Sequence, residues 1–235
     1  MRAEELTDAA SGSNCVLVSD DLLTNAPMAR PRLISDEQIL EATRRCVLER
    51  GPHVSLDVIA EQLGVTGPAL LRRFRNREEL FIRALMPDRN PEWMQEFDKG
   101  PDDRPLEVQL REHLARVWKF FEEVIPRITA LRESGIEHKK VFDNDEGPAQ
   151  AVRAITGWFK RAIEMGLVEA EEAETLTYAF MGALQYRAFI SYMVKSPNTA
   201  RSNREFLDDV ARFFCRALKP AAAAKTQIVK RKRTA

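Results

Sequence analysis

The chain of 235 residues is long enough for one or two domains with a sizeable core, and its 36 lysine and arginine residues equal its 36 aspartate and glutamate residues in number. The formal net charge of +0 argues against a protein that coats nucleic acid without regard to sequence, although a local basic face would still suit DNA. The three cysteines are scattered and fit neither a disulfide framework nor a metal spacing, no apolar run reaches the length of a membrane span, and the N-terminus lacks a signal-peptide pattern. We therefore predict a cytoplasmic protein that contacts no membrane and uses no metal or cofactor.

The first 33 residues are polar and small, and they predict a mobile N-terminal arm. A helix should begin directly after this arm, because Ser35 and Gln38 have the spacing of a capping box. Gly51-Pro52 should end it. The apolar stripe of this helix consists of Ile39, Ala42, Cys46 and Val47.

Residues 55–80 have the pattern of two short helices joined by a tight turn. Ala60 supplies the small side chain that lets the helices cross at close range, and Gly64 can adopt the positive φ that ends the first helix. Ser55 should cap the first helix and Thr66 the second. The pattern predicts a helix-turn-helix.

Four arginines follow within two helical turns, and they lack the interleaved acids that would pair with them along a helix. In an arbitrary sequence, such a charge run is most often a solvated helix face. Here the crowding of like charges beside a helix-turn-helix favours an anionic partner, and the phosphate backbone of DNA is the obvious one. The arginines are Arg72, Arg73, Arg75 and Arg77.

The sequence from Thr66 to Leu80 (TGPALLRRFRNREEL) resembles the recognition helix and following turn of the tetracycline-repressor (TetR) family of bacterial regulators. The resemblance extends over roughly residues 35–86, where apolar, glycine and basic positions fall in register. It departs at Leu71, where the family usually has a tyrosine that touches a phosphate, and at Arg77, where it usually has a lysine. Arginine can serve in place of lysine through its fork of donors, whereas leucine cannot donate a hydrogen bond.

We therefore predict that the second short helix lies in a major groove of DNA. Arg72 and Arg73 should reach base edges, because arginine suits the acceptors of guanine. Arg75, Arg77 and Ser55 should hold phosphates without reading sequence. The candidate DNA-binding residues are Ser55, Thr66, Gly67, Pro68, Ala69, Leu71, Arg72, Arg73, Arg75 and Arg77.

Residues 87–104 form the clearest boundary in the chain, because prolines, a glycine and aspartates interrupt any regular pattern. Trp93 and Phe97 within this segment indicate that part of it docks on the body of the protein. The chain beyond it is predicted to be helical. Pro126 should kink or end the first of these helices, with a shorter helix over residues 127–134 after it.

The helix predicted from Glu171 to Val194 carries apolar residues nearly all round, which is typical of a helix buried on both sides. A partner subunit explains this pattern most economically, and Gly182 would let a second backbone approach. With the helix from Glu205 to Leu218 it should form a four-helix bundle across a twofold axis, as the resemblance also implies; packing inside one monomer core is the alternative. The candidate interface residues are Tyr178, Met181, Gly182, Phe189, Met193, Phe206, Val210, Phe213 and Phe214.

The resemblance also implies a pocket for a small molecule in the C-terminal helices. Their large aromatic residues are candidates for its walls, although each fits an ordinary core position at least as well. Gln185 and Arg187 would orient the polar end of an acidic or neutral lipophilic effector. The candidate ligand-binding residues are Trp118, Phe121, Phe142, Trp158, Phe180, Gln185, Tyr186 and Arg187.

The predicted fold is all-α, with an N-terminal helix-turn-helix DNA-binding domain and a C-terminal helical domain for ligand binding and dimerisation. We expect a transcriptional repressor that binds a palindromic operator in double-stranded DNA as a homodimer and is released by a small molecule. A helical ligand-binding or scaffold protein without specific DNA binding is the alternative; an enzyme is not expected, because no catalytic or phosphate-cradling motif stands out. The predicted boundaries are 1–33 for the arm, 34–86 for the DNA-binding domain, 87–104 for the connecting segment, 105–219 for the helical domain and 220–235 for a basic disordered tail.

Overall fold

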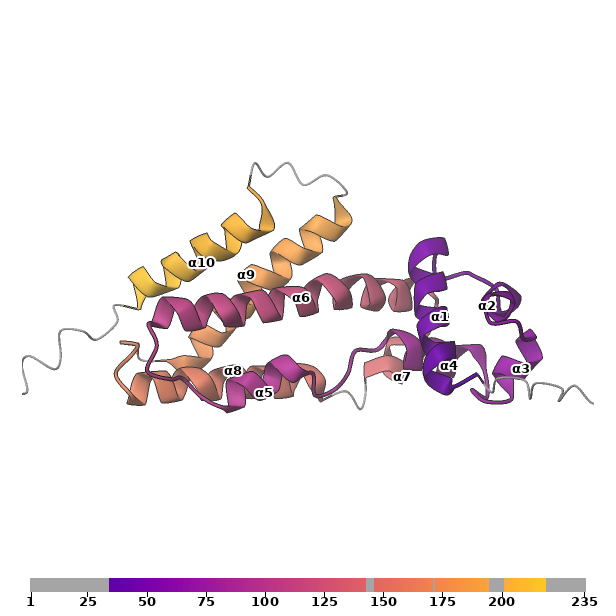
Figure 1. Cartoon of the computed structure of the whole chain (residues 1–235), viewed down its shortest axis with the longest axis horizontal. Coiled ribbons are helices and arrows are strands. Elements are labelled where there is room, and N and C mark those ends of the chain that lie inside the picture. Colours follow the sequence, from indigo (N-terminus) through magenta and orange to yellow (C-terminus); the bar gives the residue numbers. More distant parts are fainter. Residues whose placement is uncertain (1–33, 143–145, 171, 195–200, 219–235) are drawn as a thin grey trace, which may run out of the picture. The chain divides into compact units, whose positions relative to one another are not determined.

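The computed structural model describes residues 34–142, 146–170, 172–194 and 201–218. Every regular element in these ranges is a helix, so the predicted all-α fold is confirmed (Figure 1). The predicted arm and basic tail lie outside the described residues. Within the described ranges, no helix is long and apolar enough to cross a membrane.

Helix α1 (Asp36–Arg50) forms as its sequence signals predict. Ser35 and Gln38 make both hydrogen bonds of the capping box, and this satisfies amide groups that the first turn leaves without helical partners. Gly51 follows the last turn with a φ of 92°, in the left-handed region that favours glycine. The predicted apolar stripe of Ile39, Ala42, Cys46 and Val47 is buried.

The helix-turn-helix consists of α2 (Leu56–Gln62) and α3 (Gly67–Leu71). The Ser55 hydroxyl caps α2 by accepting a hydrogen bond from the amide of Val58, as predicted. Gly64 has a φ of 65°, which confirms its role in the turn. Helix α4 (Arg77–Leu85) follows, with the Asn76 side chain as its cap.

Two details of the predicted second helix are wrong. Thr66 is the N-cap residue of α3 as predicted, but its side chain makes no capping hydrogen bond. Helix α3 ends at Leu71, so Arg72, Arg73 and Arg75 lie in the turn after the helix. Arg75 has a φ of 34°, which interrupts the right-handed helical path. The chain has to bend here because Phe74, in the same turn, is completely buried.

Residues 34–86 form an N-terminal head whose core extends beyond its own helices. The core joins buried side chains of α1, α2, α3 and α4, among them Phe74, Leu80 and Phe81. Four residues from much later in the chain complete it: Ala130, Leu131, Ile136 and Val141. The boundary expected after residue 86 therefore separates helices along the sequence, but the head core includes part of the following segment.

The connecting segment contains α5 (Glu92–Asp98), which docks on the C-terminal helices as predicted from its aromatic residues. Trp93 is 6% exposed and Phe97 is 1% exposed. The guanidinium of Arg161 donates a hydrogen bond of 2.6 Å to the carbonyl of Phe97, close to the end of α5. This contact stabilises carbonyl groups that the helix itself leaves unpaired.

Helix α6 (Leu106–Glu133) runs through Pro126 without ending, so the separate helix expected over residues 127–134 is its continuation. Proline removes only one backbone donor, and tertiary packing on both sides of it holds the helix together. Before the proline, Val124 belongs to the C-terminal core; after it, Ala130 and Leu131 belong to the head core. One continuous helix thus contributes to both cores.

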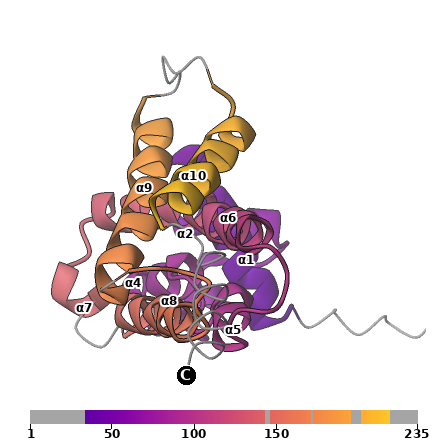
Figure 2. The same cartoon turned by 90° about the vertical axis from the view of Figure 1, so that its left-hand side faces the viewer.

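The remaining helices are α7 (His138–Phe142), α8 (Gly147–Glu164), α9 (Ala173–Met193) and α10 (Asn203–Ala217). Helix α6 contacts α5, α9 and α10, and α9 also packs on α8 (Figures 1 and 2). We call α5, α6, α8, α9 and α10 the C-terminal bundle. Its core is centred on aromatic side chains that are 0% exposed, namely Trp158, Phe159 and Phe180.

Candidate functional site

The two helices of the helix-turn-helix approach each other closely. Ala60 of α2 is 1% exposed, next to the fully buried Ile59. Gly67, at the start of α3, is also buried, and a Cβ there would come within 2.5 Å of the Asp57 carboxylate. The start of α3 is therefore buried against α2, whereas the opposite edge of α3 is exposed.

That exposed edge is basic. Thr66, Pro68 and Arg72 are exposed, and Ala69 and Leu71 are half-buried. The side chain of Arg75 is 89% exposed, and its one recorded ion pair, with Glu79, is long at 3.9 Å. Arg72 and Arg75 are therefore available to an anion arriving from solvent.

Arg73 was predicted to reach a base edge, but its guanidinium is already engaged within the protein. It lies 2.6 Å from a carboxylate oxygen of Asp36 and also donates to the carbonyl of Ile34. Both partners stand at the start of α1. The structure therefore gives Arg73 a bracing contact between the turn and α1, and its predicted base contact would require this ion pair to open.

Arg77 was predicted to hold a phosphate, and it too has partners in the head. Its guanidinium donates to the carbonyl of Pro52 and lies 4.0 Å from the centre of the Phe81 ring. Burial lowers the pKa of Arg77 from its ordinary value, although a guanidinium stays charged under all working conditions. Arg77 thus links α4 to the turn between α1 and α2, with only part of its donor set free.

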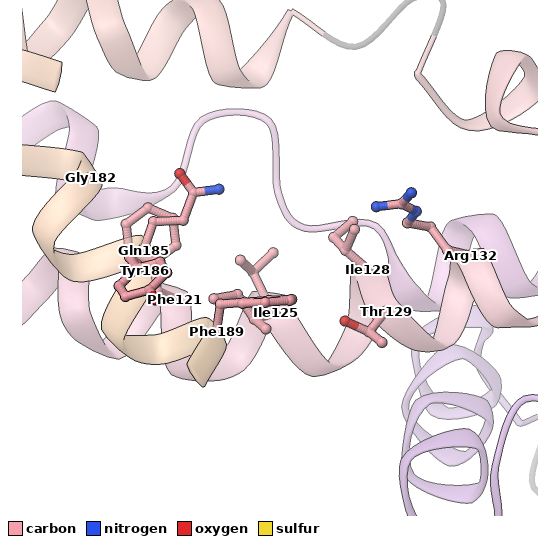
Figure 3. Close-up of a pocket in the computed structure, with 10 residues that line it drawn as sticks. Phe121, Ile125, Ile128, Thr129, Arg132, Gly182, Gln185, Tyr186 and Phe189 are labelled. Atoms are coloured by element: carbon pink, nitrogen blue, oxygen red, sulfur yellow. The ribbon is translucent and has the colours of Figure 1, made fainter. Parts of the chain in front are cut away.

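A groove of about 530 Å³ lies between α6 and α9 (Figure 3). Of the residues predicted to bind a ligand, Phe121, Gln185 and Tyr186 line it. Trp118, Trp158 and Phe180 instead pack in the core of the bundle and do not line the groove. Phe142 ends α7, and its side chain is outside the described part of the chain.

Arg187 does not line this groove either. Its guanidinium donates a 2.9 Å hydrogen bond to the carbonyl of Arg201 and lies 4.5 Å from the centre of the Phe206 ring. These contacts tie α9 to the start of α10. Sequence reasoning instead missed Thr129 and Arg132, which do line the groove. They could have been found by continuing the stripe of Phe121, Ile125 and Ile128 through Pro126 at helical spacing.

The predicted dimer surface is divided by the structure into exposed and buried parts. Tyr178, Phe189, Met193 and Phe213 are 57%, 44%, 56% and 66% exposed, and Gly182 is exposed beside them. Met181 and Phe206 are half-buried. Val210 and Phe214 are corrections to the prediction, because both are buried in the core of their own bundle and cannot contact a partner as it stands.

The sequence of the head matches a known protein family. Residues 39–84 match the sequence model of a family described as bacterial regulatory proteins, tetR family. The matched segment begins within α1 and ends within α4, so it includes the whole helix-turn-helix and the turn that carries the arginines. The chain carries a TetR-family DNA-binding domain. The resemblance predicted from the sequence is confirmed.

Solved structures extend the likeness to the bundle. The AibR complex with isovaleryl coenzyme A and operator DNA is 17% identical, with 79% of this chain and 98% of that chain covered at a TM-score of 0.53. NalD, the secondary repressor of the MexAB-OprM multidrug efflux pump in Pseudomonas aeruginosa, is 18% identical, with 76% and 93% covered at a TM-score of 0.53. The TetR regulator SCO0520 from Streptomyces coelicolor is 20% identical, with 80% and 100% covered at a TM-score of 0.52. At these identities the likeness establishes the fold alone. No curated protein sequence matches this chain.

Within this TetR-family head, two positions set the chain apart from the usual pattern. Leu71 is half-buried at the end of α3 and offers no donor to a phosphate. Arg77 replaces the usual lysine and stacks on Phe81, a contact that a planar guanidinium makes well. Of the two arginines in and beside the turn, Arg75 is therefore the more open to an anion, because its side chain is 89% exposed.

Proposed function

We propose that this protein is a transcriptional repressor that binds a palindromic operator as a homodimer and is released by a small molecule. The observation that carries the proposal is the TetR-family helix-turn-helix, whose α3 edge and following turn expose Arg72 and Arg75 to solvent. Exposed guanidiniums beside a helix start suit both the phosphate backbone and the guanine edge.

The roles of the DNA-binding residues follow from their surroundings. Arg72 is the base-reading residue, and the start of α3, from Thr66 to Ala69, approaches the groove floor. Arg75 and the Ser55 hydroxyl hold phosphates and set the register. Arg73 and Arg77 act mainly as braces of the head, because each already donates to a backbone carbonyl of the protein.

The homodimer is supported by the exposed aromatic side chains of α9 and α10. Several large apolar side chains left exposed on two helices indicate an interaction site. A second copy, related by a twofold axis, would cover Tyr178, Phe213 and their neighbours and place two heads on one duplex.

Release by a ligand is supported by the course of α6, which contributes to both cores and lines the groove. A ligand lowers operator affinity only by its differential binding to the two arrangements of the heads. Because α6 is shared, a change at the groove can reach the head without passing through a loop.

Selection of bound sites from random double-stranded DNA tests the proposal. The expected result is enrichment of a palindromic site whose half-sites are about one helical turn apart or a multiple of it. Enrichment of a single unpaired half-site would overturn the homodimer, and no enrichment at low salt would favour a ligand-binding or scaffold protein without specific DNA binding.

A further inference from the structure

The groove between α6 and α9 combines apolar walls with one charged residue. Phe121, Ile125 and Ile128 supply one wall from successive turns of α6 (Figure 3). Among the described residues that line it, Arg132 carries the only charge. The groove volume of about 530 Å³ lies within the range of small-molecule sites.

Arg132 is placed to receive an anion at the end of this groove. It is exposed, and none of the described residues forms a recorded ion pair with it. Figure 3 shows its guanidinium extending back along α6 toward Ile128, the direction in which helical side chains lean. Thr129, three residues before it and on the same face of α6, adds a hydroxyl.

We propose that the groove binds an amphipathic carboxylate, with its hydrocarbon tail against α6 and α9 and its carboxylate on Arg132. A planar guanidinium and a carboxylate form paired, charge-assisted hydrogen bonds. From Phe121 to Arg132, α6 rises about 16 Å, so the ligand is a medium-length chain with one acidic head. This assignment rests on the proposed function and names the chemical class of its effector.

The same turn of α6 that holds the carboxylate also packs against the head. Ala130 and Leu131, between Thr129 and Arg132, are 5% and 0% exposed in the head core. A force on the exposed side of this turn is therefore applied to residues that the head buries on the other side. A ligand in the groove could therefore change the position of α1 and α4, which pack against α6.

Calorimetric titration of the DNA-free full chain tests the site, with decanoate and decanol as probes of equal tail length. Decanoate is expected to bind about tenfold more tightly than decanol, because a charge-assisted hydrogen bond contributes roughly that factor. Arg132→Gln should reduce decanoate binding to the level of decanol, and Arg132→Lys should restore part of the difference. Arg187→Gln is the matched control, since Arg187 is a nearby arginine engaged elsewhere, and it should leave the preference for decanoate unchanged.

Equal binding of the two probes by the natural chain, or an unchanged preference in Arg132→Gln, would overturn the assignment. If only Arg187→Gln loses the preference, the carboxylate of the ligand binds Arg187, as expected from the sequence, and not Arg132. Operator binding is measured separately on the same samples without any probe. A chain that selects a palindrome but ignores decanoate refutes the effector class and leaves the proposed function intact, whereas the reverse result refutes the proposed function.

Discussion

The N-terminal head and the C-terminal bundle differ in how completely one chain covers its own apolar side chains. In the head, Phe74, Leu80 and Phe81 are each 0% exposed. On α9 and α10, by contrast, Tyr178 is 57% exposed and Phe213 is 66% exposed. The apolar core of the head is thus covered within one chain, with α6 and the residues after it completing the cover. Helices α9 and α10 instead present a surface that we propose a second copy covers.

The largest expected effect is on the folding stability of the head. Phe74→Ala should lower the free energy of unfolding by about 3–5 kcal/mol, because it opens a cavity where an aromatic ring is fully buried. Phe213→Ala is the matched control and should change it by less than about 0.5 kcal/mol under conditions where the chain is monomeric. Urea unfolding of both variants measures this, and equal losses would show that exposure does not separate the two regions.

A charged substitution tests whether the exposed surface of α9 and α10 is a dimer interface. Phe213→Glu should shift the chain from dimer to monomer, because it replaces an exposed aromatic ring of the proposed interface by a carboxylate that would have to lose its water on association. An aromatic interface anchor contributes about 2 kcal/mol or more, so the dissociation constant should rise at least about 30-fold. Sedimentation equilibrium measures the change, with Met193→Glu as a second variant of the same surface, since Met193 is 56% exposed and does not line the groove. A dimer that survives both substitutions would contradict the proposed interface.

Acid should also distinguish the bundle from the head, because the bundle core contains a buried imidazole. His113 is 7% exposed and stacks on Phe97 with their ring centres 4.1 Å apart. Burial, aided by the Arg116 charge, lowers the pKa of His113 to about 4 from its ordinary 6.5. The unfolded chain then binds the proton more readily than the folded one, so stability is complete above pH 6.5 and is lost as pH falls toward 4.

Between pH 8 and pH 5 this loss should amount to about 2 kcal/mol. His113→Gln should remove that part of the pH dependence, whatever it does to stability at neutral pH. His53→Gln changes an exposed histidine of the head and serves as control. Urea unfolding at a series of pH values is the measurement, and an unchanged slope in His113→Gln would mean that other groups cause the acid sensitivity.

The head could be predicted closely because its signals are local. The capping box at Ser35, the cap at Ser55 and the left-handed Gly64 each act within a few residues, and each was found in the structure as predicted. The length of α3 could not be predicted, because Phe74 is drawn into a core completed by Leu131, 57 residues later in the chain. No local pattern at Arg72 or Arg75 indicates that the helix has already ended.

The candidate sites were less predictable because they depend on which partners a side chain finds. Composition identified the basic turn, but only the coordinates reveal that Asp36 engages Arg73. In the bundle, Pro126 concealed the continuation of α6, and with it Arg132 and Thr129. Val210 follows the same helical spacing as its exposed neighbour Phe213, yet it faces its own core.

Within the head, the exposed Arg72 and the paired Arg73 should affect DNA binding to different degrees. Arg72→Ala should cost about 1–3 kcal/mol of operator binding and relax the preference at one base position of each half-site. Arg73→Ala should cost less binding and more folding stability, because it removes the ion pair with Asp36. Binding to the selected operator and to single-base variants of it measures both. A uniform loss over all sequences in Arg72→Ala would make that residue a backbone contact.

Two substitutions of Arg75 distinguish the role of its charge from that of its backbone conformation, and they have the smallest expected effect. Both Arg75→Ala and Arg75→Gly remove the proposed phosphate contact, so each should flatten the slope of log affinity against log salt by about 0.9 per head. Their stabilities should differ, because residue 75 has a φ of 34° and glycine alone adopts that region without strain. Arg75→Gly should therefore be more stable than Arg75→Ala by about 1 kcal/mol. Equal stability of the two variants would show that the turn relaxes when the side chain is removed. If both variants keep the salt slope of the natural chain, Arg75 does not contact the DNA backbone.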